Sequence, residues 1–168
     1  MKFLLILIIL AFSHSLFASD ELTARYFTWD DLGERSSVHL INKHDKDKSN
    51  IITAIIGRSE DGVQRIYFSI EFHGKYNMCL PKQISETSIA KLDGQPVKMR
   101  TWCNKYTYSN SNNYYLTITP ETIAGRKFVV SRFKTAPKEV LFEHEGIVVY
   151  IPAKGFTKAW KQFGGDAL

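Results

Sequence analysis

Polar and apolar residues alternate strictly in several parts of this chain, and that period of two constrains its fold more than any other feature. In residues 65–72, Ile and Phe occupy every second position, and Arg, Tyr, Ser and Glu occupy the positions between them. Successive side chains of a strand point to opposite faces of a sheet, so this pattern indicates a half-buried β-strand. The same period in residues 97–103 turns Cys103 inward, and it recurs in residues 114–119.

Shorter β-branched or aromatic runs, bounded by turn residues, extend this picture. They are 38–41, 51–56, 128–133, 140–142 and 147–151. Together with the alternating stretches they predict about eight strands, and Ala124-Gly125 is one of the turns expected between them. Short strands at regular spacing predict a mainly β fold, an antiparallel β-sandwich or barrel.

Helix is predicted in one place, close to the C-terminus. There the apolar residues fall at i, i+3, i+4 and i+7, namely Phe156, Ala159, Trp160 and Phe163. Pro152 precedes this segment and Gly164-Gly165 follows it, as is usual at helix boundaries. We expect a short helix whose aromatic face packs against the sheet.

The same segment carries the one family resemblance in the chain. The stretch Ile151-Pro152-Ala153-Lys154-Gly155-Phe156-Thr157-Lys158-Ala159-Trp160, a strand running into a Gly-Phe-x-x-Ala helix, resembles the end of the invasion-associated locus B proteins. Those are exported bacterial β-rich proteins, so the resemblance implies export and a β-rich fold. It covers ten residues near the end of the chain and carries no functional residue over.

The first 18 residues have the pattern of a signal peptide. Lys2 precedes ten apolar residues, and a small and polar stretch follows up to Ala18. The apolar run is shorter than the roughly 20 residues that cross a bilayer, so we expect no stable membrane anchor. Cleavage after Ala18, with Ser15 or Ser19 as alternatives, removes 18 of the 168 residues and leaves one β-rich domain, 19–168, in the periplasm or the external medium.

Two cysteines, Cys79 and Cys103, are the only ones in the chain. An even number of cysteines in an oxidising compartment predicts a disulfide, and two cysteines allow one pairing. Closing a loop of this length should stabilise the fold by roughly 3 kcal/mol. Neither cysteine belongs to a C-x-x-C pair, so the expected role is structural.

Charge and motif content exclude several classes of function. The net charge of +5 comes from Lys and Arg that are scattered among Asp and Glu, which does not predict nucleic-acid binding. There is no G-x-S-x-G elbow, and Val148 stands where a zinc motif starting at His144 would need its second histidine. Residues 45–50 resemble the start of a calcium loop but lack its glycine and its closing glutamate. We expect no metal or other cofactor.

The most unusual composition surrounds a loop of Ser and Asn at 109–113. It consists of Trp102, Tyr106, Tyr108, Tyr114 and Tyr115. Tyrosine with Ser and Asn is typical of recognition loops and sugar-binding faces, although tyrosines also cover the outer faces of ordinary sheets. This segment predicts a non-enzymatic, exported binding or envelope-accessory protein whose partner is a protein or a glycan.

Two alternatives remain open. In the first, the chain is a small exported hydrolase whose site is assembled only in three dimensions, with His144 between Glu143 and Glu145 as the candidate base. In the second, it is a subunit of an envelope assembly, which would carry an exposed apolar patch or an unpaired edge strand.

Overall fold

A computed structural model describes most of the chain. The described residues are 22–42, 49–72, 79, 85–106 and 114–164. The signal peptide predicted at 1–18, most of the calcium-like loop, Tyr108 and the loop at 109–113 lie outside them.

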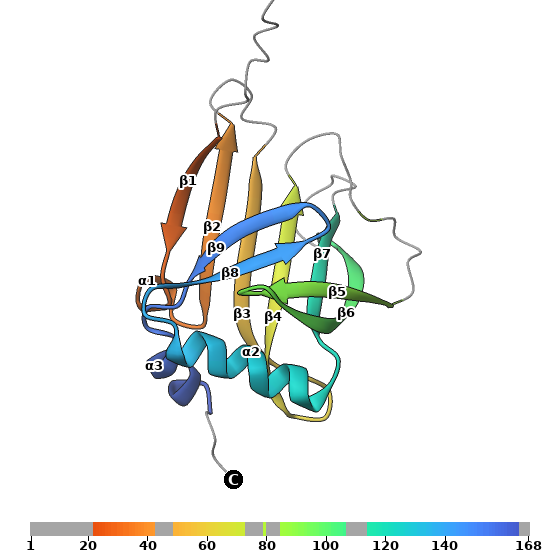
Figure 1. Cartoon of the computed structure of the whole chain (residues 1–168), viewed down its shortest axis with the longest axis vertical. Coiled ribbons are helices and arrows are strands. Elements are labelled where there is room, and N and C mark those ends of the chain that lie inside the picture. The colour runs from red at the N-terminus through yellow and green to blue at the C-terminus, as the bar shows by residue number, and fades with distance from the viewer. Residues whose placement is uncertain (1–21, 43–48, 73–78, 80–84, 107–113, 165–168) are drawn as a thin grey trace, which may run out of the picture.

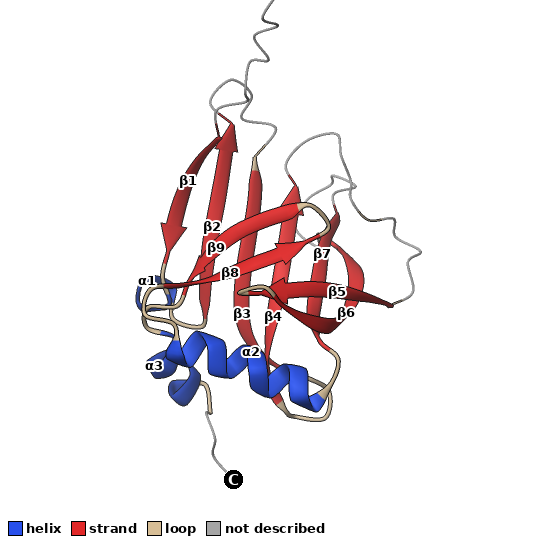
Figure 2. Ribbon diagram, viewed as in Figure 1, coloured by secondary structure: helices blue, strands red, loops and turns tan. Residues whose placement is uncertain are grey.

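The described residues form nine strands and three helices (Figures 1 and 2). The strands are β1 (Leu22–Phe27), β2 (Arg35–Asn42), β3 (Asn50–Arg58), β4 (Gln64–Phe72), β5 (Glu86–Leu92), β6 (Gln95–Lys105), β7 (Tyr114–Pro120), β8 (Glu139–His144) and β9 (Ile147–Pro152). The helices are α1 (Trp29–Leu32), α2 (Ile123–Thr135) and α3 (Phe156–Gln162). The predicted mainly antiparallel β fold is confirmed.

All nine strands belong to one sheet with the order β1-β2-β3-β4-β7-β6-β5-β8-β9, and each neighbouring pair is antiparallel. The sheet coils on itself, so that β8 and β9 cross in front of β2 to β4, as Figure 1 shows. Strand β9 packs against β2, but no ladder joins β9 to β1 in the described chain. The sheet is therefore a nearly closed barrel with two edges.

The alternating residues fill the interior of this barrel. The largest of them are Ile52, Ile56, Ile66, Phe68, Ile70, Met99, Ile118 and Phe142. Three aromatic rings from distant segments close the end near the helices, because Trp29, Phe133 and Phe156 lie with ring centroids 5.0 to 6.0 Å apart. Burying a side chain of this size contributes about 1.5–3 kcal/mol, so these alternating residues are a major source of stability.

The strand predicted at 128–133 is wrong, because these residues lie in α2, which also contains the turn expected at Ala124-Gly125. The Thr122 side chain caps the helix by accepting a hydrogen bond from the Gly125 backbone N–H at 3.0 Å. Val129 and Phe133 then fall one turn apart and are buried together. A short β-branched and aromatic run fits either structure locally, and here packing against the barrel selects the helix.

Other sequence predictions fare better. The C-terminal helix is confirmed as α3, which buries Phe156, Ala159 and Trp160. The disulfide is confirmed, with the Cα atoms of Cys79 and Cys103 5.7 Å apart. Strands β1 and β5 and helix α1 were not anticipated, since their short, polar sequences show little periodicity. No helix in the described ranges is both long and apolar enough to traverse a membrane.

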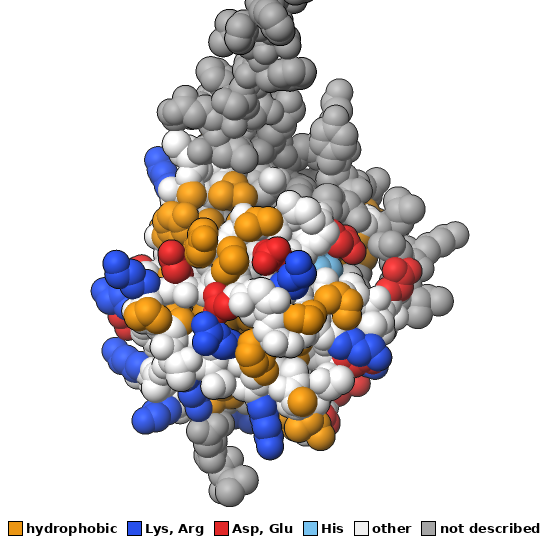
Figure 3. Space-filling model, viewed as in Figure 1, with side chains coloured by type: hydrophobic (Ala, Val, Ile, Leu, Met, Phe, Trp, Pro, Cys, Tyr) orange, Lys and Arg blue, Asp and Glu red, His pale blue; other side chains and the backbone are white. Residues whose placement is uncertain are grey.

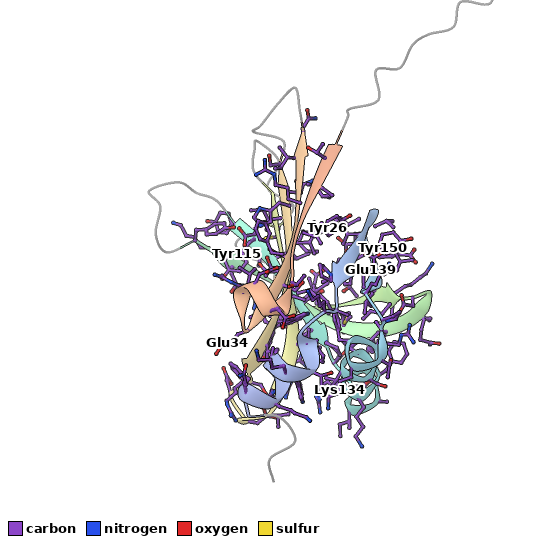
Figure 4. The ribbon with its side chains drawn as sticks, turned by 90° about the vertical axis from the view of Figure 1, so that its left-hand side faces the viewer. Tyr26, Glu34, Tyr115, Lys134, Glu139 and Tyr150 are labelled. Carbon is purple, nitrogen blue, oxygen red and sulfur yellow. A yellow bond between two sulfur atoms is a disulfide. The ribbon has the colours of Figure 1, made fainter. Side chains whose placement is uncertain are left out.

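The two sheet edges carry exposed apolar side chains. Tyr26 of β1 is 51% exposed, and Val148 and Tyr150 of β9 are 61% and 49% exposed. In Figure 4, Tyr26 and Tyr150 lie on the same side of the long strands, and Figure 3 shows apolar side chains gathered over this region. A subunit of an assembly would be expected to carry such features, but by themselves they identify no partner.

Candidate functional site

The side of the sheet that faces away from the core carries four small hydroxyl residues on adjacent strands. From β2 to β7 they are Ser37, Thr53, Ser69 and Thr117, each directly opposite the next in the ladder. We call these residues the hydroxyl row. Paired strands lie about 4.8 Å apart, so the row is about 14 Å long. Its members are 4–8% exposed.

Longer side chains surround the hydroxyl row. Next to it on the same strands lie His39, Ile51, Glu71 and Tyr115 on one side, and Arg35, Ile55 and Tyr67 on the other. Phe27 is opposite Ser37 at one end, and Trp102 is opposite Thr117 at the other. We call the hydroxyl row, together with the longer side chains that border it, the outer-face trough. Figure 4 shows Tyr115 on this face, on the opposite side of the sheet from Tyr150.

The trough deepens over β2 and β3 into a cavity of about 280 Å³. Ser37 and Thr53 lie in its floor, and Arg35, His39 and Glu71 contribute charged or titratable groups to its walls. Its volume is close to the lower limit of small-molecule pockets, which is about 300 Å³. The cavity therefore suits one compact polar group rather than a large apolar ligand.

Tyr106 connects the cavity to the tyrosine-rich segment. Its hydroxyl donates a hydrogen bond to the Glu71 carboxylate, and its ring lies 4.9 Å from the Tyr115 ring. Burial, and then the hydrogen bond to Glu71, raise the pKa of the Tyr106 hydroxyl above its ordinary value of 10.0. Tyr106 is therefore protonated at neutral pH and holds the Glu71 carboxylate in place as a hydrogen-bond donor.

The structure brings together three of the five predicted binding residues. Trp102 and Tyr115 point outward on β6 and β7, where the Trp102 ring meets the Tyr67 ring edge-on at 6.1 Å and the Tyr115 ring packs against the Tyr106 ring. Tyr114 shares the inward face of β7 with Leu116 and packs against the core instead. Tyr108 lies outside the described residues.

His144, the candidate base of the hydrolase alternative, lies at the end of β8. Its residue is 2% exposed, its Nδ1 is 3.4 Å from the Ile89 carbonyl oxygen, and its Nε2 is 3.9 Å from a Glu145 carboxylate oxygen. It lines neither the cavity over β2 and β3 nor the two cavities beside α2.

A different histidine meets a serine in the cavity. Ser37 and His39 are two residues apart on the same face of β2, and Ser37 Oγ lies 3.2 Å from His39 Nε2. The Phe27 ring packs against the His39 ring, with the centroids 4.8 Å apart. The sequence analysis missed this pair. Its signal was the alternation in β2, which places Arg35, Ser37 and His39 on one face.

Among the described residues, no group of three or more His, Cys, Asp or Glu side chains is placed to hold a metal ion. No protein-family model, curated protein or solved structure matches this chain. Function is therefore argued from the geometry of the outer-face trough.

Proposed function

We propose that this chain is an exported, non-enzymatic binding protein that recognises a glycan with the outer-face trough. The observation that carries the proposal is the hydroxyl row itself, which is bounded by the aromatic rings of Phe27 and Trp102 at its ends. Export is supported by the disulfide between Cys79 and Cys103, a bond typical of oxidising compartments outside the cytoplasm.

The chemistry of the trough matches a ligand rich in hydroxyl groups. Ser and Thr hydroxyls both donate and accept hydrogen bonds, as sugar hydroxyls do. The Glu71 carboxylate has acceptor sites for two or more further hydrogen bonds, and the Arg35 guanidinium has several N–H donors. Aromatic rings beside these groups supply apolar faces at a small entropic cost. A sugar ring, which is apolar on its faces and polar at its edge, uses both kinds of contact.

A glycan fits this face better than a protein does. The core of a protein interface is usually formed by exposed, large apolar or aromatic side chains. In the described chain the exposed large apolar residues all lie elsewhere, at Tyr26, Val63, Ile89, Ile123, Val148 and Tyr150. The trough instead offers buried hydroxyls and half-buried rings.

The first experiment is to apply the disulfide-intact protein to an array of bacterial and host glycans and to purified peptidoglycan. Ligands that bind should then be titrated by calorimetry against Tyr115→Ala and Trp102→Ala. We expect each substitution to weaken binding by about tenfold, or about 1.4 kcal/mol, which is within the range for one aromatic contact. The matched control is Tyr150→Ala, which removes a tyrosine from β9 and should bind like the unchanged protein.

Glycan binding that is equally strong in Tyr115→Ala, Trp102→Ala and Tyr150→Ala would place the ligand elsewhere and overturn the proposal. Circular dichroism and thermal unfolding of each variant separate loss of binding from loss of fold. Retention of the fold is expected because both rings lie on the face away from the core.

A second candidate, a small hydrolase, is favoured by one specific observation, the contact between Ser37 and His39 in the cavity. A serine hydroxyl beside a histidine base is the arrangement of an activated nucleophile, and Arg35 could stabilise a developing negative charge. The test is labelling with a fluorophosphonate probe and turnover of p-nitrophenyl esters. Activity that disappears in both Ser37→Ala and His39→Ala supports the hydrolase, and an absence of labelling removes it.

A further inference from the structure

A second concave site lies at the helical end of the molecule, apart from the outer-face trough. A groove of about 500 Å³ runs between α2, the turn joining β3 to β4, and α3, which lie together in Figure 1. Its apolar lining consists of Val63, Ile123, Val130 and Trp160. We call it the α2 groove.

Helix α2 is apolar on two sides rather than one. Val129 and Phe133 are buried against the barrel, whereas Val130, which the core covers only in part, and Ile123 line the groove. Ile123 is 64% exposed, and Val63 across the groove is 44% exposed. A helix that covers one sheet needs a single apolar stripe. The second stripe, placed opposite further apolar residues, is what a ligand with an apolar body would cover.

The charges along the groove have one sign. Arg126, Lys127 and Lys134 line it, and no acidic side chain does so among the described residues. Of the acidic groups on adjoining segments, Glu121 binds cations of β6 and Asp61 binds a cation of β4, and Glu60 does not line the groove. Figure 3 shows Lys and Arg side chains over this half of the molecule. The groove therefore favours an anion.

We propose that the α2 groove binds a single fatty acid. The alkyl chain lies along the apolar lining, and the carboxylate pairs with Lys127 or Lys134. From Ile123 to Lys134 the helix rises by about 16 Å, which gives the groove the length of one extended alkyl chain. Its volume lies in the usual range of 300–1,000 Å³ for small-ligand pockets, which favours one lipid chain over a protein helix or a bilayer surface.

Trp160 provides a direct reporter, because its ring lines the groove and the Lys134 ammonium lies 5.8 Å from the ring centroid. Bromine quenches indole fluorescence on contact, so a fatty acid brominated near the end of its chain should quench Trp160 in a saturable way. The disulfide-intact protein is titrated below the micelle concentration of the ligand. The corresponding brominated alcohol, which lacks the carboxylate, is titrated in parallel and should bind at least about tenfold more weakly.

Two substitutions test the site without disturbing the core. Ile123→Asp places a carboxylate at the first residue of α2, where the helix dipole tolerates it, and Lys127→Glu reverses an exposed charge. We expect each to weaken binding by about tenfold or more, because each repels the carboxylate and the first also removes apolar surface. The matched controls are Ile89→Asp on β5 and Lys138→Glu beyond α2, which should bind normally.

Saturable quenching that is lost in the two groove variants and kept in both controls supports the proposal. Quenching that is equal in all four variants, or equally tight binding of the alcohol, overturns it. So does binding to anionic vesicles or to an acidic peptide in the absence of binding to the free fatty acid, since the occupant would then be a membrane or a protein.

Discussion

Glycine is required at position 155 by a close contact as well as by backbone conformation. Gly155 has a φ of +85°, and a Cβ there would lie 2.5 Å from an Asp30 carboxylate oxygen and 2.7 Å from the Asp30 backbone nitrogen. Gly146, in the turn between β8 and β9, has a φ of +82° with nothing within 4 Å of such a Cβ. Both glycines therefore have a backbone conformation that strains other residues, but only at Gly155 would a side chain also overlap with neighbouring atoms.

Replacing each of these glycines by alanine gives a matched comparison. We expect Gly146→Ala to lower the free energy of unfolding by about 1–2 kcal/mol, the cost of a left-handed non-glycine residue. Gly155→Ala should cost about 1–3 kcal/mol more, because α1 must also move away from the start of α3. Urea unfolding monitored by tryptophan fluorescence measures both, and equal losses would contradict the importance of the Asp30 contact.

The raised pKa of Tyr106 makes the free energy of unfolding fall at alkaline pH. Burial and the hydrogen bond to Glu71 raise its pKa in the folded state, so the folded protein holds this proton more tightly than the unfolded chain. The resulting stabilisation is fully present below the unfolded pKa of about 10 and is lost as the pH rises through the higher folded value. We expect the melting temperature of Tyr106→Phe to fall less steeply above pH 10 than that of the unchanged protein.

Thermal unfolding across this alkaline range tests the Tyr106 prediction, with Tyr150→Phe as the control for removal of one tyrosine hydroxyl. Identical slopes for Tyr106→Phe and the unchanged protein would mean that the hydrogen bond to Glu71 does not contribute.

The direction of a single side chain could be predicted from the sequence wherever polar and apolar residues alternate. The period of two correctly turned Cys103 inward, and it gave the direction of Trp102 as well. Applied to β7, the same period places Tyr114 with Leu116 on the core side, a direction that composition alone does not indicate. Composition shows which residue types are present, whereas the alternation of side chains along a strand decides which of them face outward and can contact a ligand.

At the scale of elements, α2 shows the limit of local patterns. Its apolar residues serve two surfaces, so no single helical stripe stands out, and the run Phe128-Val129-Val130 resembles a buried strand. A helix of this kind is stabilised mainly by packing and by its cap rather than by its own periodicity. In the sequence, the feature that could have indicated this helix was Thr122, because threonine is a common residue at the N-terminal boundary of a helix.

The cap of α2 can be tested by removing one hydroxyl. Thr122→Ala leaves the Gly125 backbone N–H without its side-chain acceptor, and we expect a loss of about 1 kcal/mol in the free energy of unfolding. Thr135→Ala is the control at the other end of the helix, where the hydroxyl donates to the Ser131 carbonyl. A smaller loss in Thr122→Ala than in Thr135→Ala, measured by thermal unfolding, would argue against the cap.

At the scale of the whole molecule, the order of the strands was beyond the reach of the sequence. The neighbours β4-β7 and β5-β8 bring together strands that are far apart along the chain. The outer-face trough depends on this order, because the hydroxyl row exists only when Ser69 of β4 lies opposite Thr117 of β7. Alternation gives the face of each side chain, but register across distant strands is decided by the packing of the barrel.

The two ends of the sheet are joined through Trp29. Its indole Nε1–H donates to the Pro152 carbonyl at 2.9 Å, and the Ser36 hydroxyl donates to the same oxygen at 3.1 Å. We expect Trp29→Ala to cost about 3–5 kcal/mol, since it opens a cavity and removes a buried hydrogen bond. The matched control is Trp102→Ala on the outer face, which should cost about 1 kcal/mol or less. Similar losses in urea unfolding would show that Trp29 does not hold the barrel closed.

The contact between Trp29 and Pro152 joins residues 123 positions apart, and this separation determines when the protein can finish folding. The contact forms only after β9 has reached the compartment where the chain folds, so part of the core stays exposed to water around the first strands until then. A chain interrupted before Pro152 lacks the second half of this contact. Such a product would present apolar surface to proteases, whereas the complete chain conceals it as soon as α3 docks.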